Sequence, residues 1–283
     1  MKRAKLSLKT IKKYKDFLYE EERSTSTINK YMRDIRAFYE YLPEDKMVTK
    51  EVLVAYKQSL ADKKYKISSI NSMLVAINGL LEFMNLSSFK LKLHKLQRNV
   101  ICEEELSKEE YKRLLEAALR KENERLYMLL QTICGTGIRV SEHQYITVES
   151  LEEGKSIVHN KGKTRVIFIP DKLRKILILY CKQEKILSGP IFVTKRGNPM
   201  DRSNIWVAMK KLCEDAKVDE KKVYPHNLRH LFALTYYRMQ KDVVRLADIL
   251  GHSNIETTRI YTMTSGKEYQ KSLSKMDLVD LLC

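Results

Sequence analysis

Several short segments of this sequence carry side chains that could act together on a phosphate ester. The string Gly-Thr-Gly-Ile-Arg at 135–139 breaks one helix and starts another, which leaves Arg139 at a helix N-terminus. Helix N-termini attract anions, and a guanidinium there can donate two hydrogen bonds to phosphate oxygens. Taken alone, the string also fits an ordinary surface arginine that follows a turn.

Two lysines lie in a predicted hairpin turn. The string Asn-Lys-Gly-Lys at 160–163 separates two β-branched or apolar runs, 156–158 and 166–169. This pattern is typical of a β-hairpin. Lys161 or Lys163 could reach from such a turn into a nucleic-acid groove, and the alternative is a solvated turn lysine.

The remaining segments contribute imidazoles, a second arginine and a phenol. His226 and Arg229 are three residues apart, so one helical face would carry a proton-transfer group and a phosphate clamp. Gly251 ends a helix and leaves His252 at a corner, and Tyr261 follows nine residues later. Each of these residues alone could equally be structural, as a packed histidine or a core tyrosine.

The charge of the chain indicates a polyanionic partner. Its formal net charge is +17, and the excess is divided almost equally between the two halves. Nucleic acid fits this distribution, and a basic housekeeping protein is the alternative. No run approaches the roughly 20 apolar residues of a membrane-spanning helix, and no secretory signal is visible, so we expect a cytoplasmic, nucleoid-associated protein.

The cysteines indicate neither a disulfide framework nor a metal centre. There are 5 of them, widely scattered, with no Cys-x-x-Cys pair. The cysteine pattern therefore does not predict a zinc site.

Apolar periodicity divides the chain into two domains. Residues 1–90 are predicted to form a four-helix unit, and residues 91–104 a basic linker. Ser107 and Glu110 form a predicted capping box that opens a second domain over 105–283. The basic residues expected to contact DNA around the linker are Lys90, Lys92, Lys95 and Arg98.

The second domain reads as helices around a small β region. Predicted helices lie near 107–121, 123–134, 172–186, 202–217, 226–240, 242–250, 255–261 and 267–281, with a short one from Arg139. Predicted strands lie at 146–148, 156–158 and 166–169.

The order and spacing of the reactive residues resemble the phage integrase, or tyrosine recombinase, family, in particular its two-domain Xer type. The matching set is Arg139, Lys161, His226, Arg229, His252 and Tyr261. The strings Thr-Gly-Ile-Arg-Val-Ser-Glu at 136–142 and Leu-Gly-His-Ser at 250–253 are the most diagnostic. The likeness is close over the second domain, whereas the first domain matches only in kind.

The resemblance implies a mainly α fold with a small antiparallel sheet. A helical, SAM-like core-binding domain would precede an α+β catalytic domain. It also implies cleavage and rejoining of duplex DNA through a 3′-phosphotyrosyl intermediate and a Holliday junction. Tyr261 would be the nucleophile, His226 the base and Lys161 the proton donor to the leaving oxygen. Arg139 and Arg229 would hold the phosphate, so the chemistry that the resemblance implies would use neither a metal nor a cofactor.

Three further residues take supporting places in this scheme. His252 would hydrogen-bond the phosphate or brace the tyrosine, and Glu142 would support the residues around it. Lys163 is the alternative to the hairpin lysine chosen above, and otherwise would contact the DNA backbone. His230 has no family role, and packing is its simpler interpretation.

The resemblance also implies partners. These are double-stranded DNA at specific sites, a homotetramer assembled through a tail helix within 267–283, and accessory DNA-bending proteins. Integration of a mobile element, resolution of chromosome dimers and DNA inversion would all use the same residues. A type IB topoisomerase-like enzyme and a non-catalytic DNA-binding relative are the alternatives.

Overall fold

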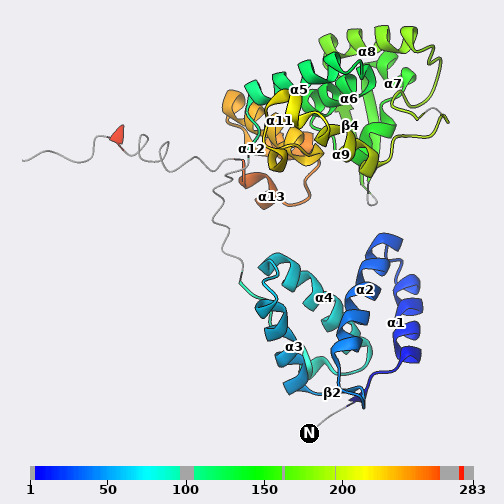
Figure 1. The fold of residues 1–283 in the computed structure, drawn as a ribbon, viewed down its shortest axis with the longest axis vertical. Helices are drawn as coiled ribbons and strands as arrows, with labels where there is room; N and C mark the ends of the chain where they lie inside the picture. Colours follow the sequence, from blue (N-terminus) through cyan, green and yellow to red (C-terminus); the bar gives the residue numbers. More distant parts are fainter. Residues whose placement is uncertain (1–3, 96–104, 161–162, 195, 262–273, 277–283) are drawn as a thin grey trace, which may run out of the picture. The chain divides into compact units, whose positions relative to one another are not determined.

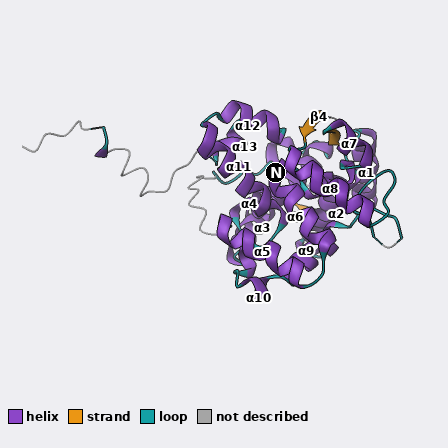
Figure 2. Ribbon diagram, turned by 90° about the horizontal axis from the view of Figure 1, so that it is seen from above, coloured by secondary structure: helices purple, strands orange, loops and turns teal. Residues whose placement is uncertain are grey.

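The computed structural model describes residues 4–95, 105–160, 163–194, 196–261 and 274–276. The chain divides into two compact units, Met1–Asn99 (unit 1) and Val100–Cys283 (unit 2). Helices make up most of each unit, and strands form only short antiparallel pairs (Figure 2). The predicted fold class, mainly α with little sheet, is confirmed.

Unit 1 is a bundle of amphipathic helices around one apolar core. Its helices are α1 (Leu8–Glu20), α2 (Thr25–Tyr41), α3 (Lys50–Asp62) and α4 (Ile67–Phe83). Ser7, Ser24 and Thr49 cap the first three by accepting a backbone N–H from the first turn. A pair of two-residue strands, β1 (Ala4–Lys5) and β2 (Met47–Val48), joins the two ends of the α1–α2 segment. Strands this short have no readable period, so the sequence did not predict them.

The chain after α4 stays on unit 1. It forms the 3-10 turn η1 (Ser87–Phe89) and then runs beside α4. The amide of Asn78 donates to the carbonyl oxygen of Leu91 (2.9 Å) and accepts its N–H (2.8 Å). Asn71 makes the same two bonds with His94, at 2.9 and 2.8 Å. The start of the segment that we expected to be a linker is therefore bound to α4.

Unit 2 surrounds a central helix. Its helices are α5 (Lys108–Arg120), α6 (Glu124–Thr136), α7 (Val148–Glu153), α8 (Asp171–Gln183), α9 (Arg202–Lys210), α10 (Cys213–Ala216), α11 (Pro225–Gln240), α12 (Val243–Leu250) and α13 (Glu256–Arg259). Helix α6 contacts α5, α8, α9 and α11 (Figure 1). The predicted capping box at the start of α5 is confirmed, since Ser107 and Glu110 exchange both hydrogen bonds.

The strands of unit 2 confirm one prediction and correct another. β3 (Lys155–Asn160) pairs with β4 (Lys163–Phe168) as the predicted hairpin. The strand predicted at 146–148 is wrong, because Thr147 caps α7 and exchanges hydrogen bonds with Ser150. This local capping box outweighs the β propensity of the branched side chains.

Three helix predictions change or lie largely outside the described residues. The helix predicted over 202–217 is interrupted between α9 and α10, and the short helix from Arg139 is the 3-10 segment η2 (Val140–Tyr145). A second 3-10 segment, η3 (Glu220–Lys222), precedes α11. The helix predicted over 267–281 lies outside the described residues except for 274–276. Among the described residues, no helix is both long and apolar enough to cross a membrane.

Candidate active site

Arg139 lies between the end of α6 and η2. Gly137 ends α6 with φ of 67°, and a Cβ there would lie 2.4 Å from the ring of Phe232, so only glycine fits. The carboxylate of Glu142 accepts from the Arg139 backbone N–H (2.8 Å) and from Nη1 (3.0 Å). The Glu142 side chain is only 1% exposed, whereas that of Arg139 is 35% exposed. A buried carboxylate thus orients a guanidinium that solvent, or a ligand, can still reach.

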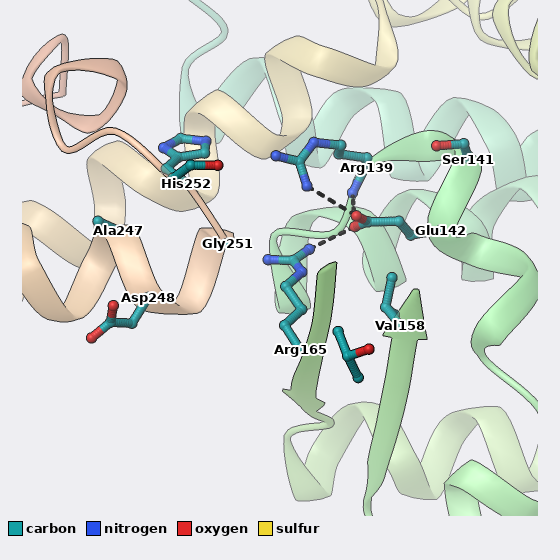
Figure 3. Close-up of a pocket in the computed structure, with 11 residues that line it drawn as sticks. Arg139, Ser141, Glu142, Val158, Arg165, Ala247, Asp248, Gly251 and His252 are labelled. Carbon is teal, nitrogen blue, oxygen red and sulfur yellow. Dashed lines mark hydrogen bonds and ion pairs between the residues drawn. The ribbon is translucent and has the colours of Figure 1, made fainter. Parts of the chain in front are cut away.

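A second arginine, Arg165 on β4, reaches the same carboxylate (Figure 3). Its Nη2 lies 2.6 Å from Oε2 of Glu142, and its Nη1 donates to the carbonyl oxygen of Ile249 near the end of α12. We did not predict Arg165 from the sequence. The signal was present, because Ile167 and Ile169 are buried at alternate positions, and a charge on that inward face of a strand requires an internal partner.

Arg229 on α11 is buried, with 1% of its surface exposed. Its Nη1 donates to the carbonyl oxygen of Gly137, and its Nη2 donates to that of Leu250 at 2.7 Å. Burial, and then the charges of Arg139 and Arg165, lower the pKa of Arg229 to about 9, so the guanidinium remains charged at neutral pH. It joins the end of α6 to the end of α12.

His252 lies beside Arg229 and is held from both sides. Its Nε2 is 3.0 Å from Nη2 of Arg229, and its Nδ1 is 2.8 Å from Oγ1 of Thr258. Arginine can only donate, so Nε2 accepts and the ring proton sits on Nδ1. Burial, followed by the nearby arginines, lowers the pKa of His252 to about 4, which keeps the ring neutral.

Tyr261 follows α13 and is packed between two imidazoles. Its ring centroid is 4.9 Å from that of His230 and 6.5 Å from that of His252, and it is nearly parallel to the second ring. The residue is 2% exposed in a small apolar cluster formed by α11 and α12. His230 is itself buried, and its Nε2 lies 3.5 Å from a carboxylate oxygen of Glu105.

His226 occupies the first turn of α11 and is exposed. Partial loss of water, and then the charges of Arg229 and other neighbours, lower the pKa of His226 below its ordinary value. A histidine with a lowered pKa is unprotonated at neutral pH, so it can accept a proton. His226, Arg229 and Arg139 all line one cavity of about 320 Å³.

A larger cavity of about 630 Å³ lies on the other side of Arg139 (Figure 3). Its lining includes Arg139, Glu142, Arg165 and His252. Arg139 therefore borders both cavities, with three arginines and two neutral imidazoles around them and one buried carboxylate between two of the arginines. This arrangement suits an anion, because the guanidiniums outnumber the carboxylate.

The predicted basic residues of the hairpin turn and the linker are only partly described by the structure. Lys161 and Arg98 lie outside the described residues, and Lys163 is placed only as the first residue of β4. Lys90, Lys92 and Lys95 are exposed on unit 1, where Lys90 pairs with Glu82 at 3.0 Å. Within the described ranges, no group of three or more His, Cys, Asp or Glu side chains is placed to hold a metal ion.

Gly251 offers a test of how closely Arg165 packs against the His252 corner. Its φ is +62°, and a Cβ there would lie 2.5 Å from Cδ of Arg165. We expect Gly251→Ala to lower the free energy of unfolding by more than the roughly 1–2 kcal/mol of the backbone strain alone. Gly189→Ala is the matched control, because its φ is +73° and nothing lies within 4 Å. If urea unfolding shows that the two variants lose the same free energy of unfolding, the contact between Arg165 and residue 251 is not tight.

Comparison with known proteins identifies the family. The sequence pattern of the phage integrase family matches residues 104–268, and that of the phage integrase N-terminal SAM-like domain matches residues 11–86. This chain belongs to the phage integrase family. The two matches fall in unit 2 and unit 1 respectively, so the resemblance predicted from the reactive residues is confirmed.

Similar family members are Xer tyrosine recombinases. Tyrosine recombinase XerA of Pyrococcus horikoshii is 28% identical over 281 residues, covering 96% of this chain and 95% of XerA. Tyrosine recombinase XerH of Campylobacter jejuni is 30% identical over 273 residues, covering 84% of this chain and 75% of XerH. These relatives confirm a Xer-like tyrosine recombinase, and with it an enzyme that cleaves and rejoins DNA.

Solved structures show the same fold. The crystal structure of XerA recombinase has a TM-score of 0.53 at 26% identity, over 96% of this chain and 99% of that one. A lambda integrase dimer bound to a COC′ core site has a TM-score of 0.74 at 18% identity, over 96% and 98%. The second likeness is one of fold alone.

Proposed function

We propose that this chain is a site-specific recombinase in which Tyr261 attacks a DNA phosphate and forms a 3′-phosphotyrosyl link. The attack would release a 5′-hydroxyl, and the matching 5′-hydroxyl of a second duplex would then attack the link and free the tyrosine. Exchange of the first pair of strands would give a Holliday junction, and exchange of the second pair would resolve it. The observation that carries this proposal is the convergence of Arg139, Arg229, His252 and Tyr261 from segments far apart in the sequence. Residues 1–90 would serve as the core-binding domain and residues 105–283 as the catalytic domain.

The nucleophile needs both a base and access. A phenol has a pKa of about 10, so it attacks slowly unless a neighbour takes its proton. His226 is neutral and exposed at the rim, which fits it for that task. Tyr261 is buried in this structure, so its hydroxyl must become accessible when DNA binds.

The arginines would stabilise the transition state. Arg139 and Arg229 would donate to the non-bridging oxygens, where negative charge accumulates as the tyrosine attacks. His252, already bonded to Arg229, would hold that guanidinium or contact the phosphate directly. Lys161 would give a proton to the leaving 5′-oxygen, with Lys163 as the alternative donor. The exposed Lys90, Lys92 and Lys95 would contact the DNA backbone.

Covalent capture tests the proposed function. The purified chain would be incubated with sheared genomic DNA of its source, and protein-linked fragments would be recovered under denaturing conditions and sequenced. We expect most recovered fragments to share one sequence, with inverted repeats around a short spacer. This sequence is called the recovered site. Capture without sequence preference, with relaxation of plasmids that lack the site, would support a topoisomerase-like enzyme. Absence of any covalent product would support a non-catalytic relative.

Assembly is proposed to use the tail, residues 267–283, of a neighbouring copy. Its apolar positions are Leu273, Met276, Val279, Leu281 and Leu282. Unit 2 carries an apolar cavity of about 340 Å³ between α5, α6 and α11 that could receive such a segment, bordered by Tyr111, Phe232 and the 71% exposed Met239. Accessory DNA-bending proteins would act on the assembled complex.

Removal of residues 267–283 is expected to separate binding from assembly. Gel-shift titration should show unchanged occupancy of one recovered site, because the DNA-binding surfaces remain. Complexes that join two sites, and recombinant product, should be lost. Met239→Glu in the receiving cavity should give the same pattern, since it replaces an apolar contact for the tail with a carboxylate that would have to lose water. Recombination at the normal rate by the truncated chain would contradict the proposed assembly.

A further inference from the structure

Arg165 joins three parts of unit 2 that are separate in the sequence. It belongs to β4, its Nη2 is bonded to Glu142 on η2, and its Nη1 is bonded to the carbonyl oxygen of Ile249 on α12. Its side chain is only 14% exposed. A buried guanidinium with both ends occupied is fixed in position, and it fixes the groups to which it donates.

The first consequence concerns the charge available on Arg139. Oε1 of Glu142 accepts from Nη1 of Arg139, whereas Oε2 accepts from Arg165 and from the Arg139 backbone. The carboxylate is therefore shared between two guanidiniums. Without Arg165, the whole negative charge of Glu142 would fall on Arg139 and weaken its attraction for a phosphate.

The second consequence concerns the corner that carries His252. Arg165 donates a hydrogen bond to the carbonyl oxygen of Ile249. Its Cδ packs against Gly251 so closely that a Cβ added at Gly251 would lie 2.5 Å from it. His252 follows immediately, and it contacts Arg229. The same side chain thus sets the position of the segment on which this imidazole depends.

We propose that Arg165 is a positioning residue for cleavage, which balances Glu142 so that Arg139 can act on the phosphate and holds the His252 corner in place. This inference rests on the proposed function of Arg139 and goes beyond it. It assigns an effect on the reaction to a strand residue whose terminal nitrogens are bonded to Glu142 and to the carbonyl oxygen of Ile249.

The test uses the recovered site as a nicked duplex in two forms. One form has the normal scissile phosphate, and in the other a methyl group replaces one non-bridging oxygen, which removes the negative charge. We expect Arg165→Gln to slow covalent capture of the normal duplex by about 10²-fold. On the uncharged duplex the same variant should lose no more than about threefold, because a neutral phosphorus needs less positive charge.

Controls separate this role from a contribution to folding. Arg174→Gln is the matched variant, since Arg174 also donates to backbone carbonyls, those of Leu151 and Glu152, but lies outside both cavities of the site. It should lower stability without changing the ratio of the two rates. If Arg165→Gln does not fold by circular dichroism, Arg165→Lys replaces it. One ammonium is too compact to serve both acceptors. We therefore expect Arg165→Lys to slow covalent capture of the normal duplex by about 10-fold and to recover on the uncharged duplex as Arg165→Gln does.

The outcomes distinguish the inference from the function on which it rests. Arg139→Gln must itself regain activity on the uncharged duplex. If it is equally slow on both duplexes, the proposed grip of Arg139 on the phosphate is wrong, and the role of Arg165 falls with it. If Arg139→Gln recovers and Arg165→Gln does not, or if Arg165→Gln cleaves the normal duplex at the wild-type rate, only the role of Arg165 is overturned.

Discussion

Tyr261→Phe is expected to abolish covalent capture of DNA while leaving DNA affinity within about threefold of the wild type, because phosphate contacts elsewhere supply most of the binding energy. The substitution removes one oxygen and keeps the ring that packs between His230 and His252. Loss of the attacking group should lower the cleavage rate by at least about 10⁴-fold, since no other group can form the same ester. Denaturing gels with end-labelled recovered site measure the rate, and gel shifts measure the affinity.

Tyr237→Phe is the matched control for this prediction. Tyr237 is partly buried against the same apolar cluster as Tyr261, and its ring lies under the ammonium of Lys241. The control should cleave as the wild type does. Persistent capture by Tyr261→Phe would show that the hydroxyl of Tyr261 is not the nucleophile. Loss of capture in Tyr237→Phe would show that the effect is not specific to Tyr261.

The second large effect is expected at Arg229. We expect Arg229→Gln to lower the single-turnover cleavage rate by about 10³-fold or more, because it removes the fixed charge proposed to stabilise the developing oxyanion. Arg229→Lys keeps the charge but not the planar fork that reaches the carbonyls of Gly137 and Leu250, and about 10²-fold is expected. Rapid-quench measurements on the nicked duplex give both rates.

Stability must be measured beside these rates. Either substitution leaves buried carbonyl groups short of a donor, which costs about 1–3 kcal/mol for each group left unpaired. Urea unfolding therefore accompanies each assay, and only folded variants are compared. Wild-type cleavage by a folded Arg229→Gln variant would contradict the assigned role of this guanidinium.

Local signals explain which parts of the fold were readable from the sequence. The capping box of Ser107 and Glu110 and the hairpin turn at 160–163 act within a few residues, so their residue types predict them directly. The strand prediction at 146–148 failed because threonine is common both in strands and at helix N-caps. The hydrogen bonds between Thr147 and Ser150 show that it is an N-cap here.

The sequence predicted most of the residue types at the site, but it predicted less of how they are arranged. Family spacing selected Arg139, Arg229, His252 and Tyr261, and the structure places them together. For Arg165, the inward strand position indicated some internal partner, but it did not identify Glu142, which is 23 residues away and linked to Arg165 by no local pattern. The burial of Tyr261 was also hidden, since it depends on packing of residues from α11 and α12 around the ring.

The polar contacts of the site explain why the arginines are held so firmly. Arg229 is fixed by main-chain carbonyls at two helix ends, and Arg139 by a carboxylate that is itself buried. Side chains held in this way would lose little freedom when a phosphate binds, so in the proposed reaction their charge would act on the transition state with little reorganisation. The same rigidity makes the geometry dependent on glycine at 137 and 251, where a Cβ would collide with its neighbours.

The most direct measurement locates the covalent bond. A captured complex would be digested with protease and nuclease, and the remaining peptide–nucleotide adduct would be sequenced by tandem mass spectrometry. We predict a single adduct on the peptide that contains Tyr261, joined through the 3′-phosphate of the cleaved strand and leaving a free 5′-hydroxyl. An adduct on another residue, or a link through the 5′-phosphate, would contradict it.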